Sequence, residues 1–309
     1  MARPIYKKKR YYILIIFIGL MMAFYKFSEF RTSDSSFTQL FEQEGYQSHD
    51  VDRVFHKGRV MRYVWAGARS KTTLIMIHGS PSSSAFWSAF FRDSTLRSEY
   101  RLVAVDRPGF GYSNFGTIEP DIEIQAELVQ KVIEEIDEGN GVYILASSYG
   151  GPVAASVAMK MGEHVDGVVF QSSSLIPGEE TTYAFTHWTR PTWIANLLPT
   201  TIRMANEEKL SHRDALDRIQ KGWSKIKSHI VFLHGSDDGL VFPANAKIAS
   251  TKSINAKSNE IRIFQGRGHD LFWTERPALI EELINLKRRV IAYDQNPEDG
   301  KLIGSLISQ

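Results

Sequence analysis

Residues 146–151 read Ala-Ser-Ser-Tyr-Gly-Gly, and this stretch decides the fold. It follows the apolar run 142–145 and precedes the small, apolar run 152–158. The first run predicts a buried strand and the second a helix, so the stretch lies at a sharp strand-to-helix turn. A serine on such a turn has its hydroxyl exposed at the end of the strand, where it could act as a nucleophile.

The residues around the turn decide between its two serines. A nucleophile here needs small residues two positions before and two positions after it, because larger side chains would collide where the backbone doubles back. Ser148 has Ala146 and Gly150 at those positions, whereas Ser147 would have a leucine and a tyrosine. The spacing therefore favours Ser148. The backbone N–H of Tyr149, at the start of the helix, would point toward a developing oxyanion.

An earlier strand, 73–77, runs into His78-Gly79-Ser80-Pro81. A backbone amide at this strand end could complete an oxyanion hole. Proline has no N–H, so the Ser80 amide is the candidate donor. For His78 we expect a hydrogen bond that fixes the loop rather than a role in proton transfer.

Two later loops supply the remaining groups of a triad. Residues 234–241 follow the strand 230–233 and contain Asp237 and Asp238. A carboxylate here could orient a histidine and stabilise its charged form. We prefer Asp238 and keep Asp237 as the alternative. His269 follows the strand 260–264 on a glycine-rich loop, and the order serine, aspartate, histidine is that of α/β-hydrolase triads.

The rest of the chain predicts a mostly parallel sheet with helices on both faces. Short runs rich in valine, isoleucine and leucine alternate with segments of helical periodicity, which is typical of α/β proteins. No strand pattern occurs between about residues 176 and 227. Aromatic residues lie there among segments of helical periodicity. We interpret this segment as a helical lid inserted into a hydrolase domain over residues 31–309. Residues 28 to about 50 are polar and predict a linker.

Taken with these pieces, Asp106-Arg107-Pro108-Gly109-Phe110-Gly111-Tyr112-Ser113 resembles the α/β-hydrolase fold superfamily. The resemblance covers about residues 50 to 292. It implies Ser148 as nucleophile, Asp238 as acid and His269 as base. It also implies an oxyanion hole made by the amides of Ser80 and Tyr149, and a structural role for the Asp106 loop.

The stretch 78–81 together with Trp87 is also similar to haloalkane dehalogenases and epoxide hydrolases. Those enzymes attack with an aspartate where this chain has Ser148. A serine ether would not hydrolyse readily, whereas an acyl-serine would. The sequence therefore predicts transfer of an acyl group to water, with an ester as the default substrate. A thioester, an amide, a lactone or a carbon–carbon bond stays open. The lid aromatics indicate either an apolar substrate pocket or only the core of the lid itself.

Two other functions stay open. An acyltransferase would use the same triad with an alcohol or amine in place of water. A membrane-tethered interaction protein could have kept the fold and lost the chemistry. No metal or organic cofactor is implied. Among 309 residues there is no cysteine, which excludes disulfides and thiolate chemistry. The net charge of +2 gives no indication of a nucleic-acid partner.

Residues 1–30 predict a membrane segment. The basic cluster 7–10 precedes the uncharged, mostly apolar run 11–25, which would cover about 22 Å as a helix. We expect an uncleaved, single-pass anchor, with a cleaved secretory signal as the alternative. The positive charges would leave the N-terminus in the cytoplasm and the catalytic domain on the other side.

Overall fold

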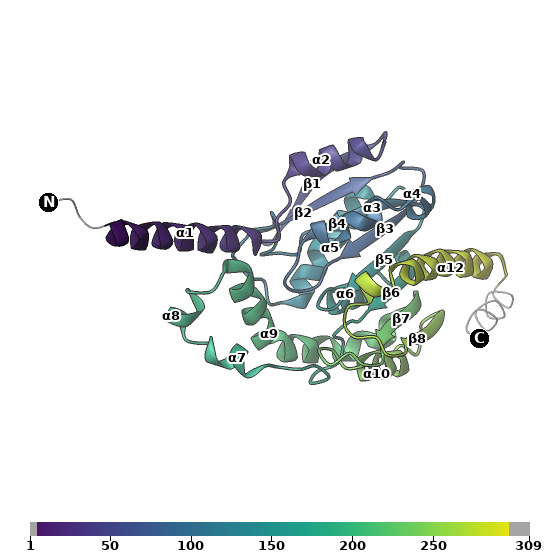
Figure 1. Cartoon of the computed structure of the whole chain (residues 1–309). Coiled ribbons are helices and arrows are strands. Elements are labelled where there is room, and N and C mark those ends of the chain that lie inside the picture. Colours follow the sequence, from purple (N-terminus) through teal and green to yellow (C-terminus); the bar gives the residue numbers. More distant parts are fainter. Residues whose placement is uncertain (1–4, 297–309) are drawn as a thin grey trace.

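The structure, a computed structural model, describes residues 5–296, except the side chains of residues 5–8, 24, 27 and 185. Within them, eight strands form one sheet in the order β1-β2-β4-β3-β5-β6-β7-β8 (Figure 1). The pairs β1–β2 and β2–β4 are antiparallel and the other pairs are parallel. The prediction of a mostly parallel sheet is confirmed. The strands are β1 (His49–His56), β2 (Arg59–Ala66), β3 (Thr72–Ile77), β4 (Tyr100–Val105), β5 (Val142–Ser147), β6 (Gly167–Gln171), β7 (His229–Gly235) and β8 (Ser258–Phe264).

Helices cover both faces of the sheet. One buried cluster joins the sheet to α5, α6, α9 and α10, and a second joins the other face to α2, α3, α4, α11 and α12. Two-sided burial is what the continuous apolar strands predict. The helices are α1 (Ile5–Phe27), α2 (Asp34–Gln43), α3 (Ser88–Phe91), α4 (Ser94–Glu99), α5 (Ile122–Ile136), α6 (Gly150–Met161), α7 (Ala184–Trp188), α8 (Thr192–Ala195), α9 (Thr200–Ile219), α10 (Ala244–Lys252), α11 (Leu271–Thr274) and α12 (Arg276–Gln295), with short 3₁₀ turns at Ser84–Trp87, Gly162–His164 and Gln220–Lys225.

The prediction of a linker between residues 28 and 50 is wrong. Helix α2 forms inside it, and Ser33 caps the helix by accepting a hydrogen bond from the Ser36 amide. Phe37 and Phe41, four residues apart, are completely buried on one side of this helix. Apolar residues at this spacing give a helix one face that packs on a core. The spacing of these two phenylalanines was therefore the signal for a helix. The mostly polar composition of the segment hid that signal.

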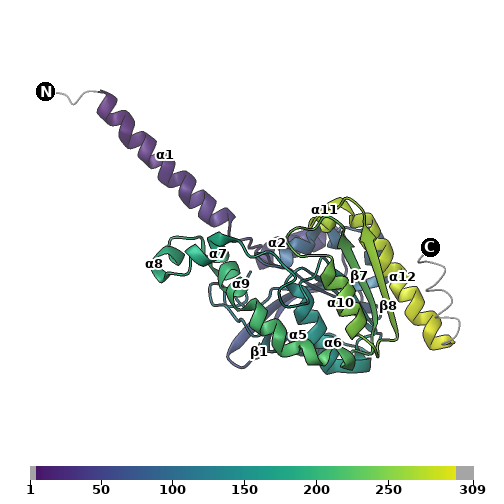
Figure 2. The ribbon, with the colours of Figure 1, turned by 90° about the horizontal axis from the view of Figure 1, so that it is seen from below.

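The predicted membrane-spanning helix is not supported. Helix α1 forms and extends away from the rest of the molecule (Figure 2). However, in the part of the chain that the structure describes, no helix combines the length and the apolar character needed to cross a membrane. The uncharged run 11–25 covers about 22 Å, less than the hydrocarbon core of about 30 Å. The base of α1 contacts the lid segment, where the Tyr25 hydroxyl donates to the Leu197 carbonyl at 2.6 Å.

The segment between β6 and β7 contains α7, α8 and α9, where the sequence predicts a lid. Helix α9 lies beside the edge of the sheet at which the parallel strands end (Figure 1). An isolated antiparallel β-bridge between Glu180 and Val241 joins the start of this segment to the loop after β7. The domain boundaries 1–30 and 31–309 stay a prediction, and residues 1–4 and 297–309 lie outside the described residues.

Candidate active site

Ser148 occupies a strained turn between β5 and α6. Its backbone has φ +50°, in the left-handed region that residues other than glycine rarely adopt. Such strain at a strand-to-helix turn is the mark of a nucleophile elbow. Gly150 explains why a small residue must follow: a Cβ atom there would lie 2.5 Å from the Ile77 carbonyl oxygen. The requirement for small residues around Ser148 thus has a direct steric cause.

We expect Gly150→Ala to lower the rate at which Ser148 reacts by about 100-fold or more. The added methyl group would push the turn away from the Ile77 carbonyl, and a misplacement of about 1 Å can cost that much. Gly239→Ala is the matched control, since a Cβ atom there has nothing within 4 Å. The check is the rate of labelling by an active-site phosphonate; equal rates for both variants would contradict the steric argument.

The structure brings the three triad candidates together. Ser148 Oγ lies 3.1 Å from His269 Nε2, and His269 Nδ1 lies 2.8 Å from Asp238 Oδ2. Asp238 is 2% exposed, whereas the His269 side chain is about one-quarter exposed. With His269 Nδ1–H donating to the carboxylate, Nε2 is left to accept the hydroxyl proton of Ser148. The geometry is that of a serine activated by an oriented base.

Asp238 is held by contacts on both carboxylate oxygens. Its Oδ1 accepts hydrogen bonds from the amides of Leu240 and Val241 at 3.0 and 2.9 Å. Burial raises the pKa of this carboxyl group, but hydrogen bonds from His234 and His269 outweigh burial and hold the pKa below its usual range. Asp238 therefore stays ionised near neutral pH, as an orienting carboxylate must.

His234 is a supporting residue that the sequence analysis missed. Its Nε2 lies 2.9 Å from the Val241 carbonyl oxygen and 3.3 Å from Asp238 Oδ2. The signal in the sequence for this role was the position of His234 at the end of a buried strand, four residues before Asp238. Asp237, the alternative acid, is exposed and its Oδ1 accepts from the Ser236 hydroxyl at 2.6 Å. The structure thus places Asp238, and not Asp237, against His269.

The two predicted oxyanion donors flank Ser148. Tyr149 directly precedes α6. Ser80 lines the same two cavities as Ser148, which are described below. Within residues 5–296, neither amide donates to a protein acceptor, so both are available to a ligand. Gly79 lets the loop approach, because a Cβ atom there would lie 3.0 Å from the Ser148 Cβ. His78 Nε2 accepts from the Arg107 amide at 3.0 Å, consistent with a loop-fixing role.

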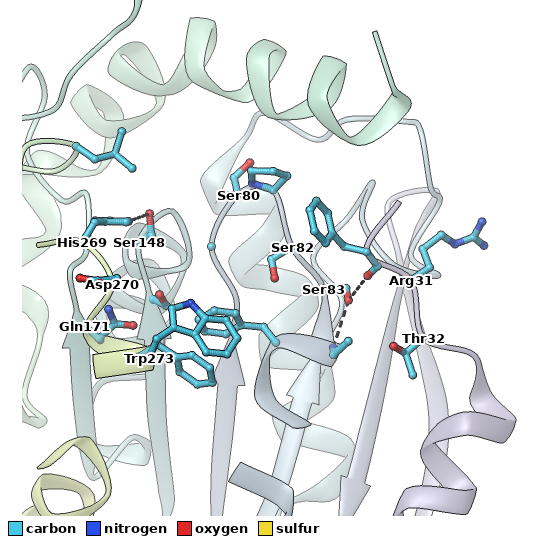
Figure 3. A pocket seen from close by; sticks show the side chains of 18 of the residues that line it. Arg31, Thr32, Ser80, Ser82, Ser83, Ser148, Gln171, His269, Asp270 and Trp273 are labelled. Atoms are coloured by element: carbon cyan, nitrogen blue, oxygen red, sulfur yellow. Dashed lines mark hydrogen bonds between the residues drawn. The ribbon is translucent and has the colours of Figure 1, made fainter. Parts of the chain in front are cut away.

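A cavity of about 730 Å³ opens in front of Ser148 and His269 (Figure 3). This volume is in the range of small-molecule sites. Its apolar lining comes from the turn after β3, the segment after α1 and helix α11. The apolar lining residues are Phe30, Pro81, Ala85, Phe86, Leu240, Phe272 and Trp273.

The expectation that lid aromatics form the apolar pocket is wrong for this cavity. Trp223 is buried in the core, while Trp188 and Trp193 are more than two-thirds exposed. Phe272 and Trp273 follow His269 closely, and sequence reasoning missed them because α11 is a single short turn. The signal in the sequence was a pair of large apolar residues three and four positions after His269.

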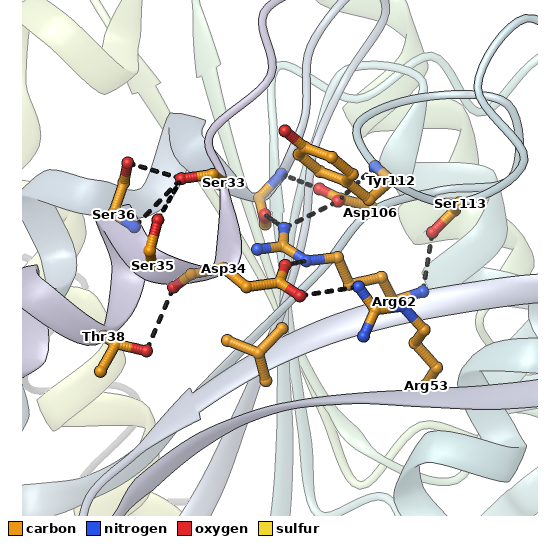
Figure 4. Close-up of polar contacts among 12 residues, drawn as sticks. Ser33, Asp34, Ser35, Ser36, Thr38, Arg53, Arg62, Asp106, Tyr112 and Ser113 are labelled. Atoms are coloured by element: carbon orange, nitrogen blue, oxygen red, sulfur yellow. Dashed lines mark hydrogen bonds and ion pairs between the residues drawn. The ribbon is translucent and has the colours of Figure 1, made fainter.

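The Asp106 loop has a structural role in this structure (Figure 4). Asp106 is fully buried and accepts hydrogen bonds from the amides of Ser84 and Tyr112 at 2.7 and 2.9 Å. Arg62 donates to it at 3.0 Å and to Asp34 of α2 at 2.9 Å. These contacts tie β2, α2 and two loops together at the rim of the site.

Arg107 and Glu208 form a buried pair that the sequence analysis also missed. Arg107 Nη1 and Nη2 donate to the two Glu208 oxygens at 2.7 and 3.1 Å, and both side chains are inaccessible to solvent. Arg107 also donates to the carbonyls of His78 and Gly79, at 2.9 and 3.1 Å. The pair therefore connects lid helix α9 to the loop that carries the Ser80 amide.

Comparisons with known proteins agree with this architecture. Residues 72–205 match the family model described as alpha/beta hydrolase fold. The chain is 32% identical over 111 residues to an Arabidopsis thaliana 1-acylglycerol-3-phosphate O-acyltransferase, covering 33% of this chain and 25% of that protein. It is 32% identical over 101 residues to a haloalkane dehalogenase of Agrobacterium fabrum, covering 33% and 32%. The chain thus spans about a quarter to a third of the length of these curated relatives.

The solved structure of a bacterial membrane phospholipase A superposes with a TM-score of 0.62 at 18% identity, covering 92% of this chain and 98% of that one. At this identity the likeness shows the fold alone. The chain has the α/β-hydrolase fold, and its residues 72–205 match the family model of that fold.

Proposed function

We propose that this protein is a serine hydrolase that cleaves a carboxylic ester, or a related acyl bond, through an acyl-serine intermediate. The observation that carries the proposal is the hydrogen-bonded chain from Ser148 through His269 to Asp238. A serine with an adjacent oriented base is the arrangement that activates a hydroxyl for attack on a carbonyl. The apolar cavity in front of the serine supports an apolar portion of the substrate.

The mechanism follows from the placement of these groups. His269 Nε2 takes the proton of the Ser148 hydroxyl as Oγ attacks the carbonyl carbon. The amides of Ser80 and Tyr149 hold the tetrahedral oxyanion, and loss of one such donor costs about 2.7–4 kcal/mol. His269 then returns the proton to the departing oxygen. A water molecule repeats both steps to release the acid and restore Ser148.

Active-site labelling tests the proposal. A fluorophosphonate probe is expected to label the wild type, and Ser148→Ala is expected to abolish labelling while Ser147→Ala preserves it. Cleavage of short and long acyl esters should follow the same pattern. A folded wild-type protein that neither labels nor cleaves any ester would overturn the proposal and favour a non-catalytic interaction protein.

An acyltransferase is the second candidate, favoured by the similarity to the Arabidopsis thaliana enzyme over a quarter of that protein's length. It differs only in the nucleophile that accepts the acyl group from Ser148. Product analysis with added alcohols or amines separates the two. Acyl products that exceed free acid at low acceptor concentration would establish transfer, whereas free acid alone would establish hydrolysis.

We further propose that the N-terminal segment associates with a membrane and that the catalytic domain acts on the non-cytoplasmic side. The support is the basic cluster before the apolar run, and the exposure of Ile13, Leu14 and Ile15 on α1, each more than half exposed. The full chain is expected in the membrane fraction, and a chain starting at residue 30 in the supernatant. A full chain recovered in the supernatant at uncleaved mass would contradict this.

A further inference from the structure

A second, smaller cavity meets Ser148 from the side of the lid. Its volume is about 160 Å³, and Ser80, Ser148 and Tyr149 line it together with residues of the lid. Ala205, Lys209 and His212 face it from α9, at the spacing of one helix side. At about 30 Å³ per water molecule, the cavity has room for about five waters. A short group therefore fits within it.

Four of the residues that line this cavity, Ser174, Glu180, Lys209 and His212, form a connected polar network. Glu180 pairs with Lys209 at 2.5 Å and accepts from the Ser174 hydroxyl at 2.6 Å. Ser174 also lies 2.9 Å from His212 Nε2, and the His212 ring packs on Tyr149 with centroids 4.4 Å apart. A polar network of this kind is costly to bury without hydrogen-bonding partners. His212 Nδ1 and the Tyr149 hydroxyl are buried and have no hydrogen-bond partner among the described residues, so this side of the cavity favours a ligand that carries oxygen atoms.

The charges of the network cancel. Glu180 and Lys209 are oppositely charged partners, and burial lowers the pKa of His212 to about 4, which leaves it neutral near pH 7. Other charged groups around the network are already engaged: Arg107 is paired with Glu208 on the same helix. A cavity with no net charge favours a neutral hydrogen-bonding group over an ion.

The position of His269 decides which half of an ester enters each cavity. His269 must protonate the departing oxygen, and it lines the larger, apolar cavity together with Asp270. The smaller cavity is lined by Tyr149 as well as by Ser80, which lines both cavities. The departing group therefore fits the larger cavity, and the acyl group fits the smaller one.

We propose that the cavity beneath α9 binds a short acyl group carrying a neutral oxygen substituent, such as a hydroxyl, recognised by the network of Ser174, Glu180, Lys209 and His212. This inference rests on the proposed hydrolase function and names the acyl half of its substrate. The substrate is then an ester of a short, oxygenated acid with a bulky apolar alcohol. The chemistry at Ser148 is unchanged.

The test uses p-nitrophenyl esters of butyrate, 3-hydroxybutyrate and decanoate with the full chain. We expect kcat/KM to be about tenfold higher for 3-hydroxybutyrate than for butyrate, since one added hydrogen bond has about that effect. Decanoate should be the poorest substrate. Lys209→Met and Ser174→Ala should reduce the ratio of 3-hydroxybutyrate to butyrate to about one, through KM for 3-hydroxybutyrate.

Lys221→Met is the matched control, because this lysine is exposed and outside both cavities. It should keep the wild-type ratio. A second series, butyrate esters of propanol, glycerol and naphthol, tests the departing half. A preference for glycerol in this series, with none for 3-hydroxybutyrate in the first, would overturn the assignment of the two cavities.

Labelling separates this inference from the proposed function. If the wild type labels and cleaves decanoate best, or if Lys209→Met leaves the ratio of 3-hydroxybutyrate to butyrate unchanged, the acyl cavity is refuted while the hydrolase stands. If the wild type neither labels nor cleaves any ester, the hydrolase function itself fails. Equal labelling rates of wild type and Lys209→Met verify that the variant is folded.

Discussion

Asp238→Asn is expected to lower kcat about 10⁴-fold while leaving the fold intact. The reason lies in how the carboxylate is held. Its Oδ1 accepts from the Leu240 and Val241 amides, so the oxygen of an asparagine would keep that place. The NH₂ group would then face His269 and donate to Nδ1. The histidine would carry its proton on Nε2, where it could no longer accept the proton of Ser148.

Asp237→Asn is the control beside it. Asp237 is exposed and contacts Ser236 rather than His269, so kcat should stay within a few-fold of wild type. Steady-state kinetics on an ester and the thermal unfolding of all three proteins provide the measurement. Comparable losses in the two variants would show that the acid of the triad is not the residue that contacts His269 in this structure.

Glu208→Leu is expected to lower the free energy of unfolding by about 3–5 kcal/mol. The substitution removes both oxygens that accept from the Arg107 guanidinium and leaves a buried charge without its partner. Loss of one member of a buried ion pair costs this much because the remaining charge stays out of water. Denaturant unfolding of the wild type and variant measures the difference.

The double variant Arg107→Met with Glu208→Leu distinguishes the buried charge from lost packing. It should recover most of the stability, since apolar side chains replace both charges. It should not recover the rate of ester cleavage. Arg107 also donates to the His78 and Gly79 carbonyls, which position the loop before Ser80. A double variant as unstable as Glu208→Leu would show that the charge is not the cause.

The central sheet and the site residues were predictable because their signals are local. Strands β3 to β7 are short, mostly apolar runs, and each candidate group lies in a loop that follows a strand. The edge strand β1 was missed because it has no such run: only Val54 among its residues is buried. Helix α2 was missed because its apolar residues are few, although they are well placed.

Local sequence favoured Ser148 over Ser147 as the candidate nucleophile. Ala146 and Gly150 are close to Ser148 in the chain, and the sharp turn tolerates no larger residue, so the choice between two serines needed no distant contact. Local sequence also predicted a parallel sheet, whose carboxyl ends bring separate loops to one edge.

Tertiary structure decided what depends on residues far apart in the chain. The choice of Asp238 over Asp237 depends on which carboxylate meets His269, 31 positions later. The lining of the two cavities, the support from His234 and the pair of Arg107 with Glu208 depend equally on packing. Contacts between distant residues arise only when the sheet and lid assemble, and no local pattern encodes which side chains they will bring together.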